Sequence, residues 1–360
     1  MAEIRPLTGL RGIAAVTVFL AHTRDTLGNH GFHFEVPEPM VRLFLSGGRQ
    51  VDIFFVLSGF ILAMNYRDWF ARAIPAASYF TFLRRRFARI YPLHFVMLLL
   101  VIAFVAAGRA LGAHSNFGYE RFRYEDLPAH FLLMHAWGIF SDDAGVWNTP
   151  SWSISIEAMA YLLFPALIWL IARGGRRWAW PALALGVAAG FGLNQLTHWG
   201  LSGFPGLARG LSEFMLGCLL SNVLGTRAAR WLQSNAGGVL AAGLLIVCYL
   251  VTPDTGFIIA VGVAPLLLAL CGQNGVGRLL AWEPIFFLGE ISYSIYLGHF
   301  LFSSIAYRLI DENWMKTGAL PTAAGVLFIF AFVLALSTAC YYLIERPGRE
   351  LLSGRRRAPA

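Results

Sequence analysis

An arginine and a histidine share one apolar stretch near the start of the chain, LTGLRGIAAVTVFLAHT over residues 7–23. Ionisable side chains are costly inside a bilayer and mark function by default when they occur there. Arg11 and His22 are eleven residues apart, so on a helix both point the same way, about 16 Å apart along the axis. One face would then carry a cation and a titratable base at two depths. Alternatively, Arg11 snorkels to the membrane interface and His22 only ends the helix.

A second apolar stretch, QVDIFFVLSGFIL, begins with a carboxylate and is interrupted by a serine and a glycine. Asp52 should lie at the depth of His22, where a carboxylate would orient the imidazole and favour its protonated form during catalysis. The alternative is a simple interaction of Asp52 with the helix dipole. Ser58 and Gly59 would let a ligand or another backbone approach closely, so Ser58 is a candidate substrate contact.

Four arginines within six residues precede a third apolar stretch, in LRRRFARIYP. Arg86 and Arg89 are spaced i, i+3 and share a helix face. Guanidinium forks bind phosphate in a bidentate manner, so this pair, with Arg85, is a candidate site for a phosphorylated cosubstrate from the cytoplasm. For Arg84 and Arg85, setting membrane orientation or binding anionic lipid is an equal alternative.

The stretch PSWSISIEAMAYLLFP carries a glutamate in the middle of a predicted helix. Ser153, Glu157 and Tyr161 follow at intervals of four and share a face, which we expect to point into the bundle. Glu157 is the second choice for a carboxylate that supports His22, with a buried structural acceptor as the alternative. Trp152, from the same stretch, is a candidate substrate contact.

Two later stretches carry further polar groups. In SYSIYLGHF, Tyr296 and His299 are candidate contacts for an acceptor substrate, although a buried hydrogen-bond network is the favoured interpretation. In LARGLSEFML, Arg209 and Glu213 are spaced i, i+4 and should neutralise each other, which indicates a structural pair.

The composition indicates the kind of element that positions these groups. The chain has 360 residues, 57% hydrophobic and 13% charged, with a mean hydropathy of +0.61. Soluble domains are nearer a quarter charged, so an integral membrane protein is predicted. Most of the apolar stretches are long enough to span a bilayer as helices. They cover residues 7–27, 51–66, 90–108, 151–172, 178–197, 204–224, 237–252, 256–272, 285–309 and 320–345.

Arginine placement predicts the topology. Positive charge accumulates on the cytoplasmic side of membrane proteins. Most arginines outside the apolar stretches fall on one side when ten helices span and the shorter candidate at 126–140 does not. We therefore predict an all-α bundle of about ten transmembrane helices with both termini cytoplasmic. Residues 1–350 would form one transmembrane domain and residues 351–360 a basic cytoplasmic tail. The first stretch is interpreted as a retained helix, not a cleaved signal peptide.

Charge and cysteine usage argue against a nucleic-acid-binding protein and against a disulfide-bonded or metal-binding one. The net charge of +8 arises from short clusters between apolar stretches, which reports membrane orientation and does not indicate nucleic-acid binding. The four cysteines lie in apolar stretches without a CxxC pair, so neither disulfides nor a metal site are expected.

These stretches, in this order, resemble the acyltransferase 3 family of bacterial membrane proteins. The resemblance rests on the Arg11–His22 spacing, VDIFFVLSGF, RRRFARIYP, TPSWSISIEAMAYLLFP, SYSIYLGHF and the closing IERP, and so covers nearly the whole chain. It implies O-acylation, most often acetylation, of a polysaccharide or other extracytoplasmic or lipid-linked carbohydrate, with acyl-coenzyme A as cosubstrate and a multi-pass location in the cell inner membrane. Carried over by position, His22 is the catalytic histidine, Arg11 its helix partner, and Arg86 and Arg89 belong to the donor site.

A membrane transporter is the alternative function. Intramembrane arginine, histidine and glutamate could then form a path for a substrate or for protons. Transporters often show inverted repeats and paired broken helices, and the sequence shows neither clearly. The oligomeric state and the acceptor are not readable from the residues.

Overall fold

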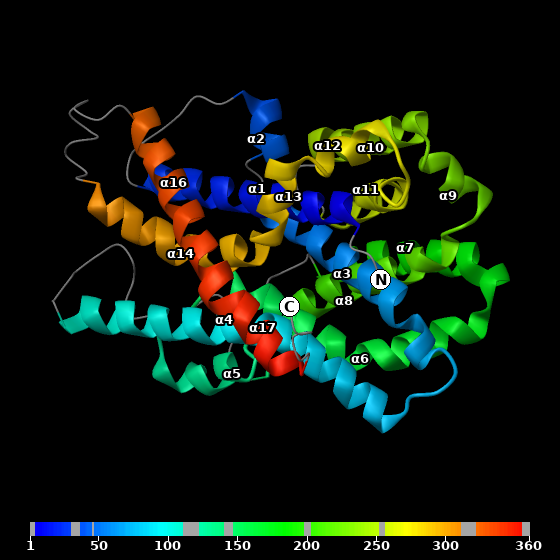
Figure 1. Cartoon of the computed structure of the whole chain (residues 1–360), viewed down its shortest axis with the longest axis horizontal. Helices are drawn as coiled ribbons and strands as arrows, with labels where there is room; N and C mark the ends of the chain where they lie inside the picture. The colour runs from blue at the N-terminus through cyan, green and yellow to red at the C-terminus, as the bar shows by residue number, and fades with distance from the viewer. Residues whose placement is uncertain are drawn as a thin grey trace, which may run out of the picture.

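The computed structural model describes residues 4–29, 37–44, 47–110, 122–139, 147–197, 203–251, 256–310 and 322–354. Within these ranges the chain is helical and contains no β-strand, in agreement with the predicted fold class. The helices are α1 (Arg5–Asn29), α2 (Glu38–Phe44), α3 (Gln50–Phe70), α4 (Ala76–Ala110), α5 (Leu127–Phe131), α6 (Ser151–Gly174), α7 (Ala179–Thr197), α8 (Gly203–Leu220), α9 (Arg227–Leu232), α10 (Asn235–Val251), α11 (Gly256–Ala269), α12 (Gly275–Leu280), α13 (Glu283–Glu290), α14 (Ser292–Leu309), α16 (Thr322–Cys340), a π-helical turn (Tyr341–Glu345) and α17 (Arg346–Ser353). Figure 1 shows their arrangement.

Each predicted apolar stretch lies in a helix, and one is broken. The stretch at 285–309 is divided at Ile291 into α13 and α14, which meet at 68°. The candidate at 126–140 forms, over its described residues, only a 3₁₀ turn, the five-residue α5 and irregular turns. This segment is too short to cross a bilayer as a helix.

Several helices have the length and composition of membrane spans. Among the described residues, four segments meet both conditions, Glu38–Phe70, Ala76–Ala110, Ser151–Gly174 and Ala324–Ser353, and the bent α13–α14 pair makes a fifth if it is counted as one span. The helices α7, α10 and α11 are apolar but shorter. The count of ten spans and the side of the termini remain predictions. The expected domain boundary at residue 350 falls inside α17, and residues 355–360 lie outside the described chain.

Small residues let the central helices approach closely. A Cβ built on Gly59 of α3 would lie 2.0 Å from the carbonyl oxygen of Phe214, and one on Gly217 of α8 would lie 2.0 Å from that of Val56. The α3–α8 crossing therefore depends on glycines from both helices, as is typical of helix packing in membranes. Between α1 and α13, a Cβ on Gly12 would meet the backbone of α13 at 2.5 Å.

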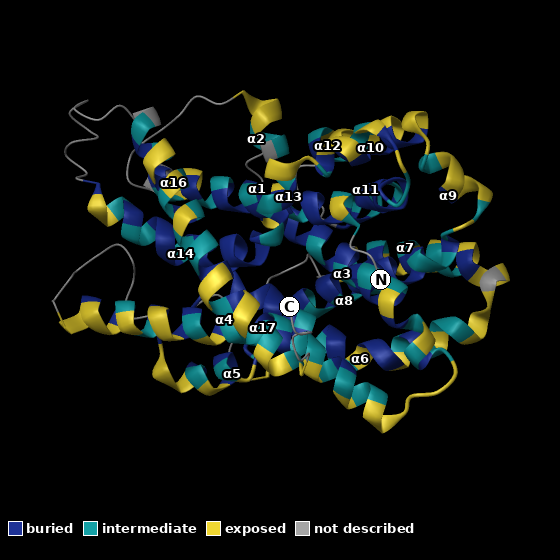
Figure 2. Cartoon of the chain, in the orientation of Figure 1, coloured by how far each residue is buried: buried dark blue, intermediate teal, exposed yellow. Residues whose placement is uncertain are grey.

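Burial follows the layering of the bundle. Buried residues collect where α1, α3, α4, α6, α8 and α14 meet, and exposed residues lie on the outer surfaces and helix ends (Figure 2). Many of the exposed side chains are large and apolar, such as Leu170 of α6, Leu185 of α7 and Leu240 of α10. Apolar side chains on the exterior, with the few ionisable side chains turned into the bundle, are the arrangement expected in a bilayer.

Candidate active site

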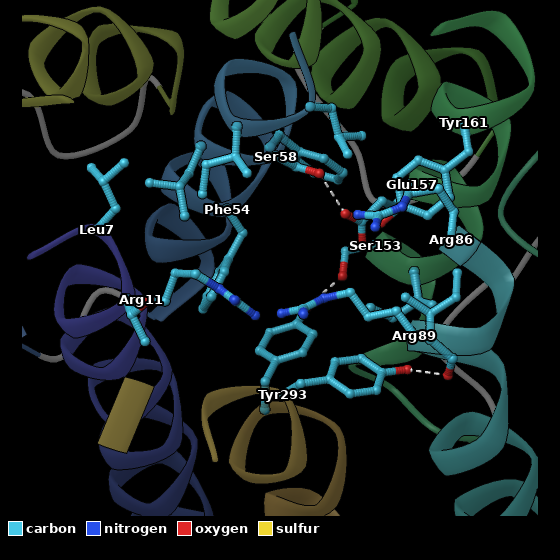
Figure 3. A pocket seen from close by; sticks show the side chains of 18 of the residues that line it. Leu7, Arg11, Phe54, Ser58, Arg86, Arg89, Ser153, Glu157, Tyr161 and Tyr293 are labelled. Carbon is cyan, nitrogen blue, oxygen red and sulfur yellow. Dashed lines mark hydrogen bonds between the residues drawn. The ribbon is translucent and has the colours of Figure 1, made fainter. Parts of the chain in front are cut away.

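A cavity of about 290 Å³ lies between α1, α3, α4, α6 and α14 (Figure 3). Its polar lining residues are Thr8, Arg11, Ser58, Asn65, Arg86, Arg89, Ser153, Glu157, Tyr161, Tyr293 and Tyr296. The structure therefore places six of the predicted site residues in one cavity, although they come from five helices that are far apart in the sequence. These six are Arg11, Ser58, Arg86, Arg89, Glu157 and Tyr296.

Three guanidinium groups face this cavity. Figure 3 shows Arg11 of α1 and Arg89 of α4 reaching toward each other from opposite sides. Arg86 donates a hydrogen bond to the hydroxyl of Tyr66 at 3.2 Å. Arg11 and Arg89 form no ion pair with any residue in the described part of the chain. Guanidinium groups that converge on a cavity and are not engaged in ion pairs can bind an anion.

Two carboxylates lie close to these cations, and each is held by a serine. Ser58 of α3 donates to Glu157 Oε1 of α6 at 2.6 Å, which joins two walls of the cavity. Ser294 donates to Glu345 Oε2 at 2.9 Å, and Glu345 is buried, within electrostatic reach of Arg89 and Arg11. Three guanidiniums therefore face two carboxylates, and the site keeps an excess of positive charge.

Glu345 is a buried carboxylate near the cavity arginines that was not singled out from the sequence. In the sequence, the closing IERP served only as one of the motifs that carry the family resemblance. Here the chain forms a π-helical turn over Tyr341–Glu345, and such turns are frequent at functional sites. The signal available in the sequence was an acidic residue directly after an apolar stretch.

His22 lies beyond the end of the cavity and contacts a second histidine. Its Nδ1 is 2.9 Å from Nε2 of His299, and the planes of the two rings differ by 7°. His299 is completely buried, and its Nδ1 lies 2.7 Å from the carbonyl oxygen of Tyr296. Tyr296 lines the cavity and donates or accepts a hydrogen bond with Ser153 at 2.8 Å. One turn of α14 thus connects the cavity to the histidine pair.

Asp52 does not contact His22, which corrects the expectation from the sequence. Asp52 is fully buried, and its Oδ1 accepts a hydrogen bond from Nε of Arg209 at 2.7 Å. Arg209 also donates to the carbonyl oxygen of Gly48 at 2.6 Å. The first turn of α3 directs Asp52 toward α8, so the carboxylate joins these two helices. The expected pairing of Arg209 with Glu213 on its own helix is likewise replaced by the ion pair with Asp52.

Two further predicted residues lie outside the cavity lining. The Arg85 guanidinium stands 5.1 Å over the ring of Trp69. Trp152 packs under Arg209, whose guanidinium is 5.4 Å from the centre of one of its rings. Both contacts are of the cation–π type and indicate structural roles.

Comparison with known proteins identifies the family. A family model described as an acyltransferase domain matches residues 5–342. The chain belongs to the acyltransferase 3 family. It is 31% identical to acyltransferase MdmB of Streptomyces mycarofaciens, over 100% of this chain and 95% of that protein. No solved structure matches it.

Two further relatives of this acyltransferase are longer proteins. The peptidoglycan O-acetyltransferase OatA of Listeria monocytogenes is 22% identical over 96% of this chain and 55% of its own length. O-acetyltransferase OatA of Staphylococcus aureus is 23% identical over 96% of this chain and 57% of its own length. The chain spans about half of these two relatives. The family, the apolar helices and the names of the relatives together establish a membrane acyltransferase.

Proposed function

We propose that this protein is an integral-membrane O-acyltransferase that moves an acyl group, acetyl in the first place, from cytoplasmic acyl-coenzyme A to a hydroxyl of an extracytoplasmic or lipid-linked carbohydrate. The observation that carries the proposal is the cavity in which Arg11 faces Arg86 and Arg89 without an ion-pair partner for Arg11 or Arg89 in the described chain. The names of the OatA relatives support acetyl as the group and peptidoglycan-like carbohydrate as the class of acceptor.

The arginines fit the phosphates of the donor. Coenzyme A carries several phosphate oxygens, and planar guanidiniums bind such groups through paired N–H donors. Arg86 and Arg89 belong to the arginine-rich start of α4, which the positive-inside rule assigns to the cytoplasm, where the donor is made. The acyl arm would then extend along the face of α1 that runs from Arg11 toward His22.

His22 is the proposed general base. Its ring nitrogen accepts the proton of the acceptor hydroxyl while the oxygen attacks the thioester carbon. A new C–O bond forms, the C–S bond breaks, and the imidazolium returns the proton to the coenzyme thiolate. Ser58, held by Glu157, supplies a polar contact within the cavity. The hydroxyl groups of Ser58 and Tyr296 are proposed substrate contacts.

Replacing the base tests the proposal. Inverted membrane vesicles from a deletion strain, carrying each variant, would receive radiolabelled acetyl-coenzyme A on the exposed cytoplasmic face. Label incorporated into membrane glycans is counted, and mass spectrometry of the strain's glycans identifies the acceptor. His22→Ala should reduce incorporation by about 10²- to 10⁴-fold, the usual contribution of a general base.

A matched control separates loss of chemistry from loss of structure. Ile13 lies on the same helix and is 39% exposed, so Ile13→Ala should incorporate label at the wild-type rate. Undiminished incorporation by His22→Ala, at equal protein level in the membrane, would remove His22 from the mechanism. Movement of unmodified substrate across the vesicle without covalent change would indicate a transporter instead.

A further inference from the structure

The contact between His22 and His299 joins two ring nitrogens. The nitrogens are 2.9 Å apart, the ring centres are 5.1 Å apart and the ring planes are parallel to within 7°, so the two rings meet nearly end to end in a hydrogen bond. A hydrogen bond between two imidazoles needs an N–H on one ring and a lone pair on the other. The direction of this bond therefore decides which nitrogen of His22 is left to act as a base.

The other nitrogen of His299 decides the direction. Nδ1 of His299 lies 2.7 Å from the carbonyl oxygen of Tyr296 and 3.2 Å from that of Ile295. Carbonyl oxygens only accept hydrogen bonds, so Nδ1 carries the hydrogen. The ring is fully buried and has no carboxylate among its hydrogen-bond partners, so it is neutral. Nε2 of His299 therefore carries the lone pair, and it accepts a hydrogen bond from Nδ1–H of His22.

This chain of hydrogen bonds fixes the tautomer of His22. With the hydrogen on Nδ1, the Nε2 atom of neutral His22 carries the free lone pair. We propose that His299 is a positioning residue that holds His22 in the tautomer and ring plane in which Nε2 removes the proton from the acceptor hydroxyl. The inference rests on the proposed function, in which His22 is the base.

The role differs from that of a carboxylate in a Ser-His-Asp triad. There an anion orients the histidine and stabilises the imidazolium. Here the orienting group is a neutral imidazole whose own orientation comes from the backbone of α14. The imidazolium formed on His22 still donates to Nε2 of His299, and hydrogen bonds from charged donors are stronger than neutral ones. His299 thus stabilises the imidazolium of His22 while carrying no charge of its own.

The surroundings of the pair agree with a positioning role. The ring of Phe19 lies 6.3 Å from that of His299 and the ring of Tyr296 lies 6.2 Å from it, so aromatic groups enclose His299. Asp25, one turn along α1, is the charged group that acts on His22 from its own helix. Since His299 has no exposed surface, it acts through His22 and does not contact the carbohydrate directly, which revises the expectation that it binds the substrate.

Two substitutions of equal length test the hydrogen bond. His299→Gln keeps an acceptor oxygen near the position of Nε2, whereas His299→Met has the same length without that acceptor. In the inverted vesicles with radiolabelled acetyl-coenzyme A, we expect His299→Met to lower the maximal rate by about 10- to 150-fold, the value of one charge-assisted hydrogen bond. The donor KM should stay unchanged. His299→Gln should recover most of the lost rate.

A purely structural role would not produce this pattern, because both variants remove the ring. Wild-type rates in both variants would overturn the inference, and so would equal inactivity of both at normal membrane levels. In either case a loss of activity in His22→Ala leaves the proposed function standing. Full activity of His22→Ala overturns the proposed function as well. Should His299→Met fail to accumulate, His299→Leu supplies the second acceptor-free variant. Ser304→Ala, which removes only a bond to the backbone of α14, is the fold control and should match the wild type.

Discussion

Replacing Arg89 with glutamine is expected to weaken binding of the acyl donor without unfolding the protein. Arg89 lines the cavity and, within the described residues, has no ion-pair partner. Its removal therefore breaks no salt bridge that holds helices together. The substitution should instead weaken binding of the anion that the guanidinium would contact.

The size of the effect follows from the contact that is lost. A hydrogen bond to a charged group contributes about 1.5–3 kcal/mol, and about 1.4 kcal/mol corresponds to a tenfold change in an equilibrium constant. Arg89→Gln should therefore raise the donor dissociation constant by about 10- to 150-fold. Arg89 faces Arg11 across the cavity, so its removal relieves repulsion between like charges in the empty site but also removes a cation that acts on the buried Glu345. These two effects on stability oppose each other.

Binding is measured directly with the purified protein in detergent, by equilibrium dialysis of radiolabelled coenzyme A. The donor KM in inverted vesicles is measured alongside. Arg84→Gln is the matched control, because Arg84 belongs to the same arginine cluster but is exposed and outside the cavity lining. It should bind coenzyme A like the wild type. Unchanged affinity in Arg89→Gln, or an equal loss in Arg84→Gln, would refute the assignment of this cavity to the donor.

Two other predictions concern the scaffold. Gly59→Ala should destabilise the protein by about 3 kcal/mol, the upper end for overpacking, because its Cβ would collide with the backbone of α8. Gly192→Ala is the control and should be nearly neutral, because a Cβ there meets no atom within 4 Å. Thermal unfolding of the two purified variants tests this, and equal melting temperatures would contradict the reasoning. Asp52→Asn removes one partner of the buried ion pair between Asp52 and Arg209, and breaking such a pair typically costs about 3–5 kcal/mol of stability. The same melts detect it, and a variant of normal stability that lacks activity would instead place Asp52 in the chemistry.

The positions of the helices were predictable from the sequence, because each apolar stretch is long and bounded by charged or turn-forming residues. The first stretch, predicted over 7–27, is α1 from Arg5 to Asn29. The break at Ile291 was not predictable, since residues 285–309 read as one continuous apolar segment. The bend follows from packing of α13 against α1, which no local pattern encodes.

The residues of the cavity were predictable as a set, but several of their partners were not. Periodicity indicates which side chains share a face and at what depth they lie. It does not give the rotation of a helix about its axis. That rotation directs Asp52 to its ion pair with Arg209 and directs His22 to its hydrogen bond with His299. These pairs are separated by 157 and 277 residues. Only tertiary packing could bring them together.

Because the chain bends between α13 and α14, these two consecutive helices both pack against α1 but run in different directions. The first arm packs on the half of α1 that contains Arg11, with Gly289 against the carbonyl of Thr8, and the second arm brings His299 to His22. The two arms, bent by 68° relative to each other, thereby contact both the arginine end and the histidine end of α1. Lengthening this elbow by one residue would rotate the second arm by about 100° and disengage the imidazoles while leaving the arginines in place. The elbow therefore sets where His299 of the second arm meets His22, whereas the spacing between His22 and Arg11 belongs to α1 itself.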